Sequence, residues 1–340
     1  MKKRQKGDEM EENLNNQYES VLNFLYYASS TLCAEYNVEI EIDIIPNLEL
    51  NARVYQDRIN TRKYHIEIFS GCLGLEYSIG QIITRFEDDD LPFFSYVKDF
   101  SIFDKNEDDA YIDTFVNMFS SVMLLHILFH ECGHVIAGHL MKETHRFEFD
   151  KEKKGSYEQQ EKEIVADWIS TKYTLLSFLN AIYSMNIPDE EVSVYIKQVM
   201  LLFWVSLSIE FQIFDNKHIN ETVKNSERTH PHPSVRLFNC IEATNEAVYD
   251  FLIMHGLEKS VAARTTDNLI LCMSTPLLVF QSLMETPIFK ELFSINTIDY
   301  YIILREIPIL HDIERKYWHL PQLSSHYRER AEQYISQFNS

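Results

Sequence analysis

The segment His130-Glu131-Cys132-Gly133-His134 places two histidines four residues apart, with a glutamate directly after the first. On a helix this spacing is about 400° of rotation, so both imidazoles project from one face, one turn apart. Two neutral imidazole nitrogens at that separation can take two corners of a zinc tetrahedron. Glu131 would then lie beside the ion, where it can accept a proton from water. We predict one Zn²⁺ per chain here; the alternative is a buried helix whose histidines are satisfied by hydrogen bonds.

A second acidic segment, Glu163-Ile-Val-Ala-Asp167, follows at the start of a predicted helix. Glu163 is the natural third ligand, because a His₂Glu set leaves the fourth position of the ion open. Asp167 lies one turn further on the same face and could accept the far N–H of a ligating histidine, which fixes its tautomer. The alternative is that both acids complement the helix dipole in the first turn.

A third segment, Thr229-His230-Pro231-His232-Pro233, combines two histidines with two prolines. The prolines keep the chain extended, so a histidine here could be aimed at a fixed point. Near a scissile carbonyl it could stabilise an oxyanion. His230 is the first candidate for this role and His232 the second; the alternative is a polar turn that caps the next helix.

Other residues near the zinc motif are interpreted as structural. His126 lies one turn before the motif on the same face, but three successive turns span about 12 Å, too far for one ion, so it is predicted to be a core or rim histidine. The remaining interpretations are that Cys132 is a small buried residue, that Gly133 and Gly138 allow close helix packing, and that His139 is solvated.

The elements that must position these residues are mostly helical. Glycine (8) and proline (9) are scarce, and long apolar runs have helical spacing. Alternating apolar residues predict two strands, at 38–44 and 64–69. The predicted fold class is therefore α+β, mostly α-helical, with a central helix that carries the HExxH motif and a small β-sheet. The predicted helices are 18–35, a segment from 70 to about 85, 111–141, 163–185, 190–214, 233–255, 259–283 and 323–337, and 142–162 is predicted to be an exposed loop.

The domain organisation follows from this pattern. Residues 1–17 are polar and are predicted to form a disordered tail. Residues 18–340 form one domain, made of an N-terminal helix and small sheet (18–110), a zinc-binding core (111–255) and a C-terminal helical part (256–340).

Charge and cysteine content limit the partners and the compartment. The net charge is −21, from 31 basic and 52 acidic residues, and it opposes nucleic acid or anionic lipid as a primary partner. Five widely spaced cysteines without a CxxC pair indicate reduced thiols in a cytoplasmic protein. The most apolar stretches, 199–209 and 268–280, are shorter than the roughly 20 residues of a membrane helix. We therefore expect buried helices and no stable membrane insertion.

The order HExxH, ExxAD and a His-Pro segment that ends in Arg236 resembles the gluzincins, the thermolysin-like branch of zinc peptidases. Two groups share its details: the HtpX-like and CAAX-processing peptidases, and the soluble Lit-type phage-exclusion peptidases of bacteria. The membrane helices expected of the first group are missing, which favours the second group or another soluble relative. The resemblance covers the chain from His130 to Arg236.

The resemblance implies that His130, His134 and Glu163 bind zinc, that Glu131 is the general base, and that Asp167 hydrogen-bonds a ligand. It implies a zincin-like fold in which the strand at 64–69 forms the edge of a peptide-binding cleft. The expected function is a zinc-dependent metalloendopeptidase that hydrolyses an intracellular protein, with a role in phage defence (abortive infection). An activating partner is also expected, because the polar loop 142–162 could cover the cleft until one arrives. The alternative is a non-catalytic zinc protein, a former peptidase that serves as a sensor or interaction module.

Overall fold

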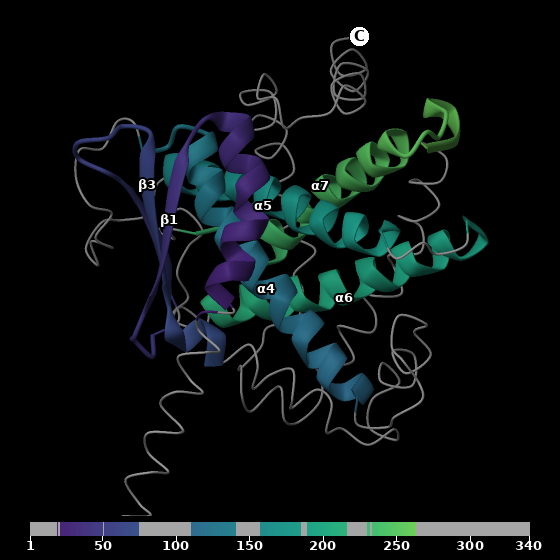
Figure 1. Cartoon of the computed structure of the whole chain (residues 1–340), viewed down its shortest axis with the longest axis horizontal. Helices are drawn as coiled ribbons and strands as arrows, with labels where there is room; N and C mark the ends of the chain where they lie inside the picture. Colours follow the sequence, from purple (N-terminus) through teal and green to yellow (C-terminus); the bar gives the residue numbers. More distant parts are fainter. Residues whose placement is uncertain are drawn as a thin grey trace, which may run out of the picture.

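The computed structural model describes residues 19, 21–49, 51–74, 110–140, 157–184, 189–215, 230–231 and 233–262 of the 340-residue chain. Long helices dominate this part, and a small sheet accompanies them (Figure 1). The predicted α+β, mostly helical class is confirmed. The helices are α4 (Ala110–Ile136), α5 (Tyr157–Tyr183), α6 (Asp189–Asp215) and α7 (Pro233–Met254), and residues 21–36 form a further helix. The predictions for 1–17, 75–85, 142–156, 263–283 and 323–337 lie outside the described residues.

The sheet has three strands in the order β1-β3-β2. Strand β1 (Glu39–Ile45) runs parallel to β3 (Lys63–Phe69), and β2 (Ala52–Gln56) pairs with β3 in the antiparallel direction. The two predicted strands are confirmed, but β2 was missed. Because β3 is the central strand and is paired on both sides, the prediction that 64–69 forms the edge of a cleft is wrong. In the described sheet, the free edges belong to β1 and β2.

One face of the sheet packs on α4 and on the helix at 21–36. Alternation along the strands sends isoleucine and valine side chains to this face, where burial of apolar area stabilises the contact. The same cluster draws aliphatic and aromatic side chains from the two helices. Its fully or almost fully buried members include Leu25, Leu32, Ile42, Val54, Ile66, Ile68, Leu128, Phe129 and Cys132. The helix that carries the HExxH motif is thus covered by the sheet.

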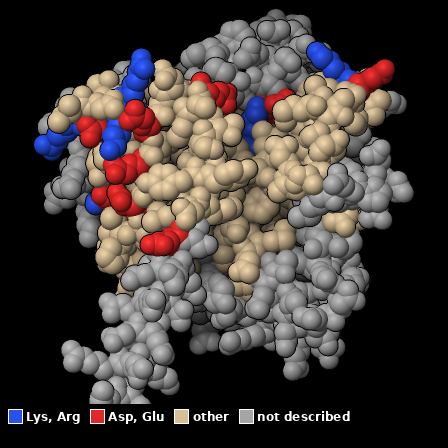
Figure 2. Space-filling model, viewed as in Figure 1, with Lys and Arg blue, Asp and Glu red and all other residues tan. Residues whose placement is uncertain are grey.

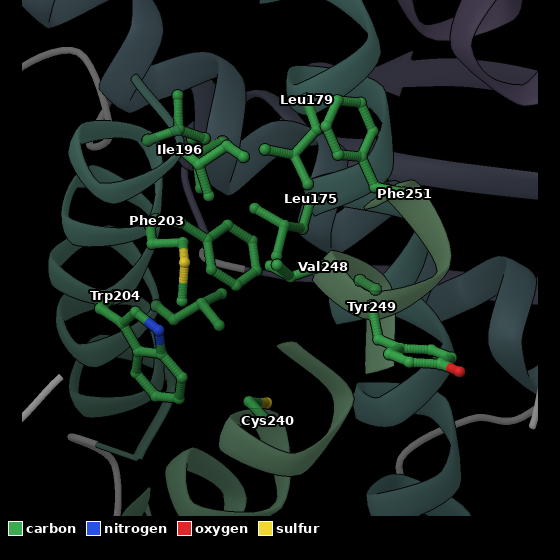
Figure 3. Packing of buried hydrophobic residues seen from close by; sticks show 14 of the residues in the cluster. Leu175, Leu179, Ile196, Phe203, Trp204, Cys240, Val248, Tyr249 and Phe251 are labelled. Atoms are coloured by element: carbon green, nitrogen blue, oxygen red, sulfur yellow. The ribbon is translucent and has the colours of Figure 1, made fainter. Parts of the chain in front are cut away.

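A second core joins α5, α6 and α7. Large apolar side chains from the three helices meet in one cluster (Figure 3), which also takes Val122 from α4. The labelled members are Leu175, Leu179, Ile196, Phe203, Trp204, Cys240, Val248, Tyr249 and Phe251. Helix α4 therefore contributes side chains to both cores and lies at the centre of the described structure.

Two of the described helices are long and apolar enough to cross a membrane by length and composition alone. They are the parts of α4 and α6 at Val116–Ile136 and Val194–Phe211, so the apolar segment around 199–209 is longer than expected. Most of each segment is buried inside the fold, which is the behaviour of core helices. The stretch 268–280 lies outside the described residues.

Charged side chains on the face shown in Figure 2 concentrate over the sheet. Charged side chains of the sheet pair across neighbouring strands: Lys63 Nζ lies 2.8 Å from Glu41 Oε2, and Arg53 Nε donates to Glu67 Oε2. The Lys63–Glu41 pair is open to solvent and contributes little to stability, whereas Glu67 is largely buried. The two pairs bind β1 and β2 to the central strand through side chains as well as through the backbone.

The boundaries of the two helices that carry the motifs differ from prediction. Helix α4 ends at Ile136 rather than near 141, and α5 begins at Tyr157, so the part of the predicted loop from 157 to 162 is helical. Glu163 therefore lies in the second turn of α5. The alternative that it is a first-turn acid complementing the helix dipole is wrong, because that effect is confined to the terminal turn.

Candidate metal-binding site

Helices α4 and α5 lie very close together at Gly133. A Cβ atom built on Gly133 would lie 2.8 Å from Ala166 Cα and 3.0 Å from Ala166 O. The interpretation that Gly133 allows close packing is confirmed. Because the two backbones nearly touch here, side chains one turn away on either helix can reach the same point between them.

Three side chains meet at that point, from the first two sequence motifs. The ligand atoms of His130, His134 and Glu163 all lie within 4.8 Å of one another. His130 Nε2 is 3.2 Å from His134 Nε2 and 3.2 Å from Glu163 Oε2, and His134 Nε2 is 3.7 Å from Glu163 Oε1. A tetrahedral ion with ligands at about 2.0–2.1 Å separates neighbouring ligand atoms by about 3.3 Å. The group could hold a metal ion.

The carboxylate of Glu163 is the strongest sign that the group fits a cation. Its Oε1 atom accepts a hydrogen bond of 3.0 Å from Gln159 Nε2, one turn earlier in α5. Its Oε2 atom is buried and is approached by two imidazole nitrogens, His130 Nε2 at 3.2 Å and His230 Nε2 at 3.3 Å. A buried carboxylate is costly unless a positive charge lies beside it, and a metal ion between these nitrogens and the carboxylate would supply that charge.

His130 is braced by a network from two other helices. Its Nδ1 atom donates to Asp167 Oδ1 at 2.8 Å. Asp167 in turn accepts two hydrogen bonds from Arg236 of α7. Arg236 Nε donates to Oδ2 and Nη2 donates to Oδ1, both at 2.7 Å. The Arg236 guanidinium also lies over the ring of Phe211 in α6, 4.3 Å from its centroid. This network directs Nε2 of His130 toward Glu163, the orientation that a metal ligand requires.

His134 is braced differently, by a residue just beyond the end of its own helix. His134 Nδ1 lies 2.9 Å from His139 Nδ1, and His139 is 5% exposed. The interpretation that His139 is solvated is therefore wrong. Gly138 adopts a positive φ of 70° and ends the helix, a conformation that glycine adopts without strain.

The pKa values of His130, His134 and Glu163 are shifted in different directions. Burial alone would lower the pKa of His130, but hydrogen bonds to Asp167 and Glu163 outweigh it and raise that pKa to about 10. Burial lowers the pKa of His134 to about 3, with the neighbouring charge on His130 acting in the same direction. Burial opposes ionisation of Glu163, but the nearby histidines hold its pKa well below the usual range. His130 is therefore protonated beside the ionised Glu163, and it must lose that proton when it binds a metal ion.

Two further predicted site residues border the group. Glu131 is 9% exposed, and burial raises its pKa to about 7, opposed by the charge on His130. His230, just before α7, has Nε2 at 3.3 Å from Glu163 Oε2, but it is not part of the group whose ligand atoms all lie within 4.8 Å. It thus lies beside the metal position. His232 lies outside the described residues.

The remaining interpretations near the motif agree with the structure. His126 is fully buried, and its Nδ1 atom lies 2.8 Å from Glu210 Oε1 of α6, as expected for a core histidine. Cys132 is fully buried. Two site residues were missed: Gln159, because its segment was assigned to a loop, and His139, whose signal is the glycine before it.

Comparisons of the chain with family models, with curated proteins and with solved structures find no match. The case for a metal site is therefore made by the geometry of the four helices and by the motif pattern.

Proposed function

We propose that this chain is a zinc-dependent metalloendopeptidase. The observation that carries the proposal is the convergence of His130, His134 and Glu163 on one buried point, with Glu131 and His230 beside it. Two imidazoles and one carboxylate are the donor set of catalytic zinc sites, in which the fourth position stays open. A purely structural zinc site has four protein ligands and does not need a neighbouring base.

Zinc held by these residues would polarise a peptide carbonyl and lower the pKa of water. Glu131 would take the proton of the attacking water and deliver it to the leaving amine. Burial raises the pKa of this carboxyl, which favours its taking up a proton, although a bound cation would act in the opposite direction. The burial that raises this pKa also excludes bulk water from the proton transfer.

His230 would stabilise the oxyanion that forms on the carbonyl oxygen. Its Nε2 atom lies 3.3 Å from a carboxylate oxygen of Glu163, and its side chain is 30% exposed, so it faces the site and can also reach a substrate. Pro231 directly follows it, which restricts the backbone and fixes its direction. A fixed donor aimed at developing charge is the most effective form of such stabilisation.

Among the described strands, β2 has one edge that pairs with no other strand, and we assign this edge to the peptide substrate. Strand β2 contacts α4, and its other edge is already paired with β3. An extended peptide can add to such an edge through backbone hydrogen bonds, with side-chain pockets giving specificity. This assignment replaces the expectation that 64–69 would form the edge.

The proposal includes three further expectations from the sequence: an intracellular protein as substrate, an activating partner and a role in phage defence.

The test is hydrolysis of dye-labelled, unfolded casein by the zinc-loaded native chain and by Glu131→Gln. The variant keeps the side-chain volume and the metal ligands, so zinc content and thermal unfolding should match the native chain while hydrolysis falls by at least about 10³-fold. Equal hydrolysis by both proteins would contradict the assigned mechanism. The same assay is repeated with cell-extract proteins as substrate, with and without extract from phage-infected cells. A chain that binds zinc but hydrolyses none of these proteins would favour the non-catalytic alternative.

A further inference from the structure

His139 is a buried, titratable residue to which the proposed mechanism gives no role. It lies beyond α4, is 5% exposed, and has its Nδ1 atom 2.9 Å from Nδ1 of His134. The two rings meet edge to face, with centroids 5.2 Å apart and an interplanar angle of 60°. This contact lies on the side of the His134 ring opposite to the Nε2 atom that faces Glu163.

The helix end itself creates the contact. Gly138 N donates to Val135 O at 3.1 Å, and His139 N donates to His134 O at 3.0 Å. These two bonds, with Gly138 at φ 70°, form the Schellman motif, which brings the second residue after the helix against the residue that accepts its N–H. In most proteins an apolar pair occupies these two positions. Here the pair is His139 and His134.

We propose that His139 is a positioning residue that prepares His134 to bind the metal. A metal ligand must present its Nε2 lone pair, so the proton of neutral His134 must sit on Nδ1. Nδ1 of His139 accepts that proton in a hydrogen bond, and His139 therefore carries its own proton on Nε2. The opposite tautomer pair, with His139 as the donor, would place a proton on Nε2 of His134 and block the metal. This inference rests on the proposed zinc site.

His139 is not itself a ligand in this account. It is outside the group of ligand atoms that lie within 4.8 Å of one another, and its Nδ1 atom contacts the far side of the His134 ring. It performs for His134 the task that Asp167 performs for His130, but as a neutral acceptor in place of a carboxylate. Removal of such a hydrogen-bond partner weakens metal binding by about 10- to 100-fold.

The test compares zinc affinity, by competition with a chelator, in the native chain, His139→Phe and His139→Gln. Phe fills the space but cannot accept a hydrogen bond, so its affinity should fall by about 10- to 100-fold. Gln offers a carbonyl acceptor, so its affinity should stay within a few-fold of the native value. Equal affinity of Phe and native, or equal losses for Phe and Gln, would overturn the inference. Thermal unfolding in chelator identifies a variant that has lost its fold.

A measurement on the native, zinc-loaded chain does not depend on any variant folding. Long-range ¹H–¹⁵N correlation of the histidine rings should show His139 with its proton on Nε2 and an accepting Nδ1. A proton on Nδ1 of His139 in the zinc-loaded protein would overturn the inference. A native chain that binds no zinc would instead contradict the proposed function itself, so the two failures are distinguishable.

Discussion

The two histidines that α4 contributes to the candidate metal site, His130 and His134, are held by different means. His130 donates a hydrogen bond to Asp167 of α5, which itself accepts two hydrogen bonds from Arg236 of α7. His134 is braced by His139, a residue of the turn that ends the same helix. The first arrangement depends on the packing of three helices, and the second depends on one local hydrogen-bond pattern. A defect in packing should therefore disable the His130 side, whereas a defect in the helix end should loosen only the His134 side.

The difference has a physical reason in the charges involved. Asp167 and Arg236 are both buried, and a buried charge is tolerated only when it is paired and hydrogen-bonded. Burial favours the neutral carboxyl of Asp167, but Arg236 and His130 outweigh it and hold the pKa of Asp167 far below its usual range. A neutral imidazole such as His139 needs no counter-charge, so a short turn is enough to hold it.

The largest effect is expected from Asp167→Asn, which breaks the Asp167–Arg236 network that holds His130. It leaves the buried guanidinium of Arg236 without its counter-charge, and such a loss costs about 3–5 kcal/mol of unfolding free energy. Zinc affinity should fall as well, because His130 loses its carboxylate acceptor. Urea unfolding of the metal-free proteins measures the first effect.

The double variant Asp167→Asn with Arg236→Met is the control for that prediction. Removing both charges should restore part of the lost stability, since a buried pair can be replaced by apolar groups at little cost. Zinc affinity should stay low in the double variant. An Asp167→Asn chain as stable as the native chain would show that this network does not organise the site.

A smaller effect is expected from Gly133→Ala, which acts on both histidines together. The new Cβ would lie 2.8 Å from a backbone atom of Ala166, so α4 and α5 must separate. Overpacking of this kind costs about 1–3 kcal/mol, and both ligands would move away from Glu163. Gly74→Ala is the matched control, because its Cβ would meet nothing within 4 Å. Equal thermal unfolding of the two variants would contradict the close approach.

The smallest effect is expected from Gly138→Ala, which changes only the turn that places His139 against His134. The positive φ of 70° disfavours alanine by about 1 kcal/mol, while asparagine tolerates it better. Gly138→Ala should lower zinc affinity several-fold through displacement of His139, and Gly138→Asn should stay closer to the native chain. Chelator competition separates the two variants. An order in which Asn binds zinc more weakly than Ala would contradict the role of this turn.

The sequence predicted the parts of the site that follow helical spacing. The four-residue separation of His130 from His134, and of Glu163 from Asp167, placed each pair on one helix face, and the structure brings the two faces together. The same periodicity predicted the four long helices to within a few residues at most ends, apart from the early start of α5.

The rest depends on features without periodicity. Strand β2 is five residues long and carries Arg53 and Gln56, so its pattern gave no clear alternation. The role of His139 follows from a single glycine at a helix end, and Gln159 was assigned to a loop because the segment before Glu163 is strongly polar. Which of two strands lies at a sheet edge depends on their pairing order, which local sequence does not specify.

The most direct test of the central claim is zinc stoichiometry, measured by elemental analysis of protein purified without chelator, for the native chain and for Glu163→Ala side by side. The account predicts one zinc per native chain and little or none in the variant, because Glu163 supplies the third ligand on the buried point between α4 and α5. A native chain that holds no metal even after zinc is added back would contradict it, and so would a Glu163→Ala chain that retains one zinc with native affinity.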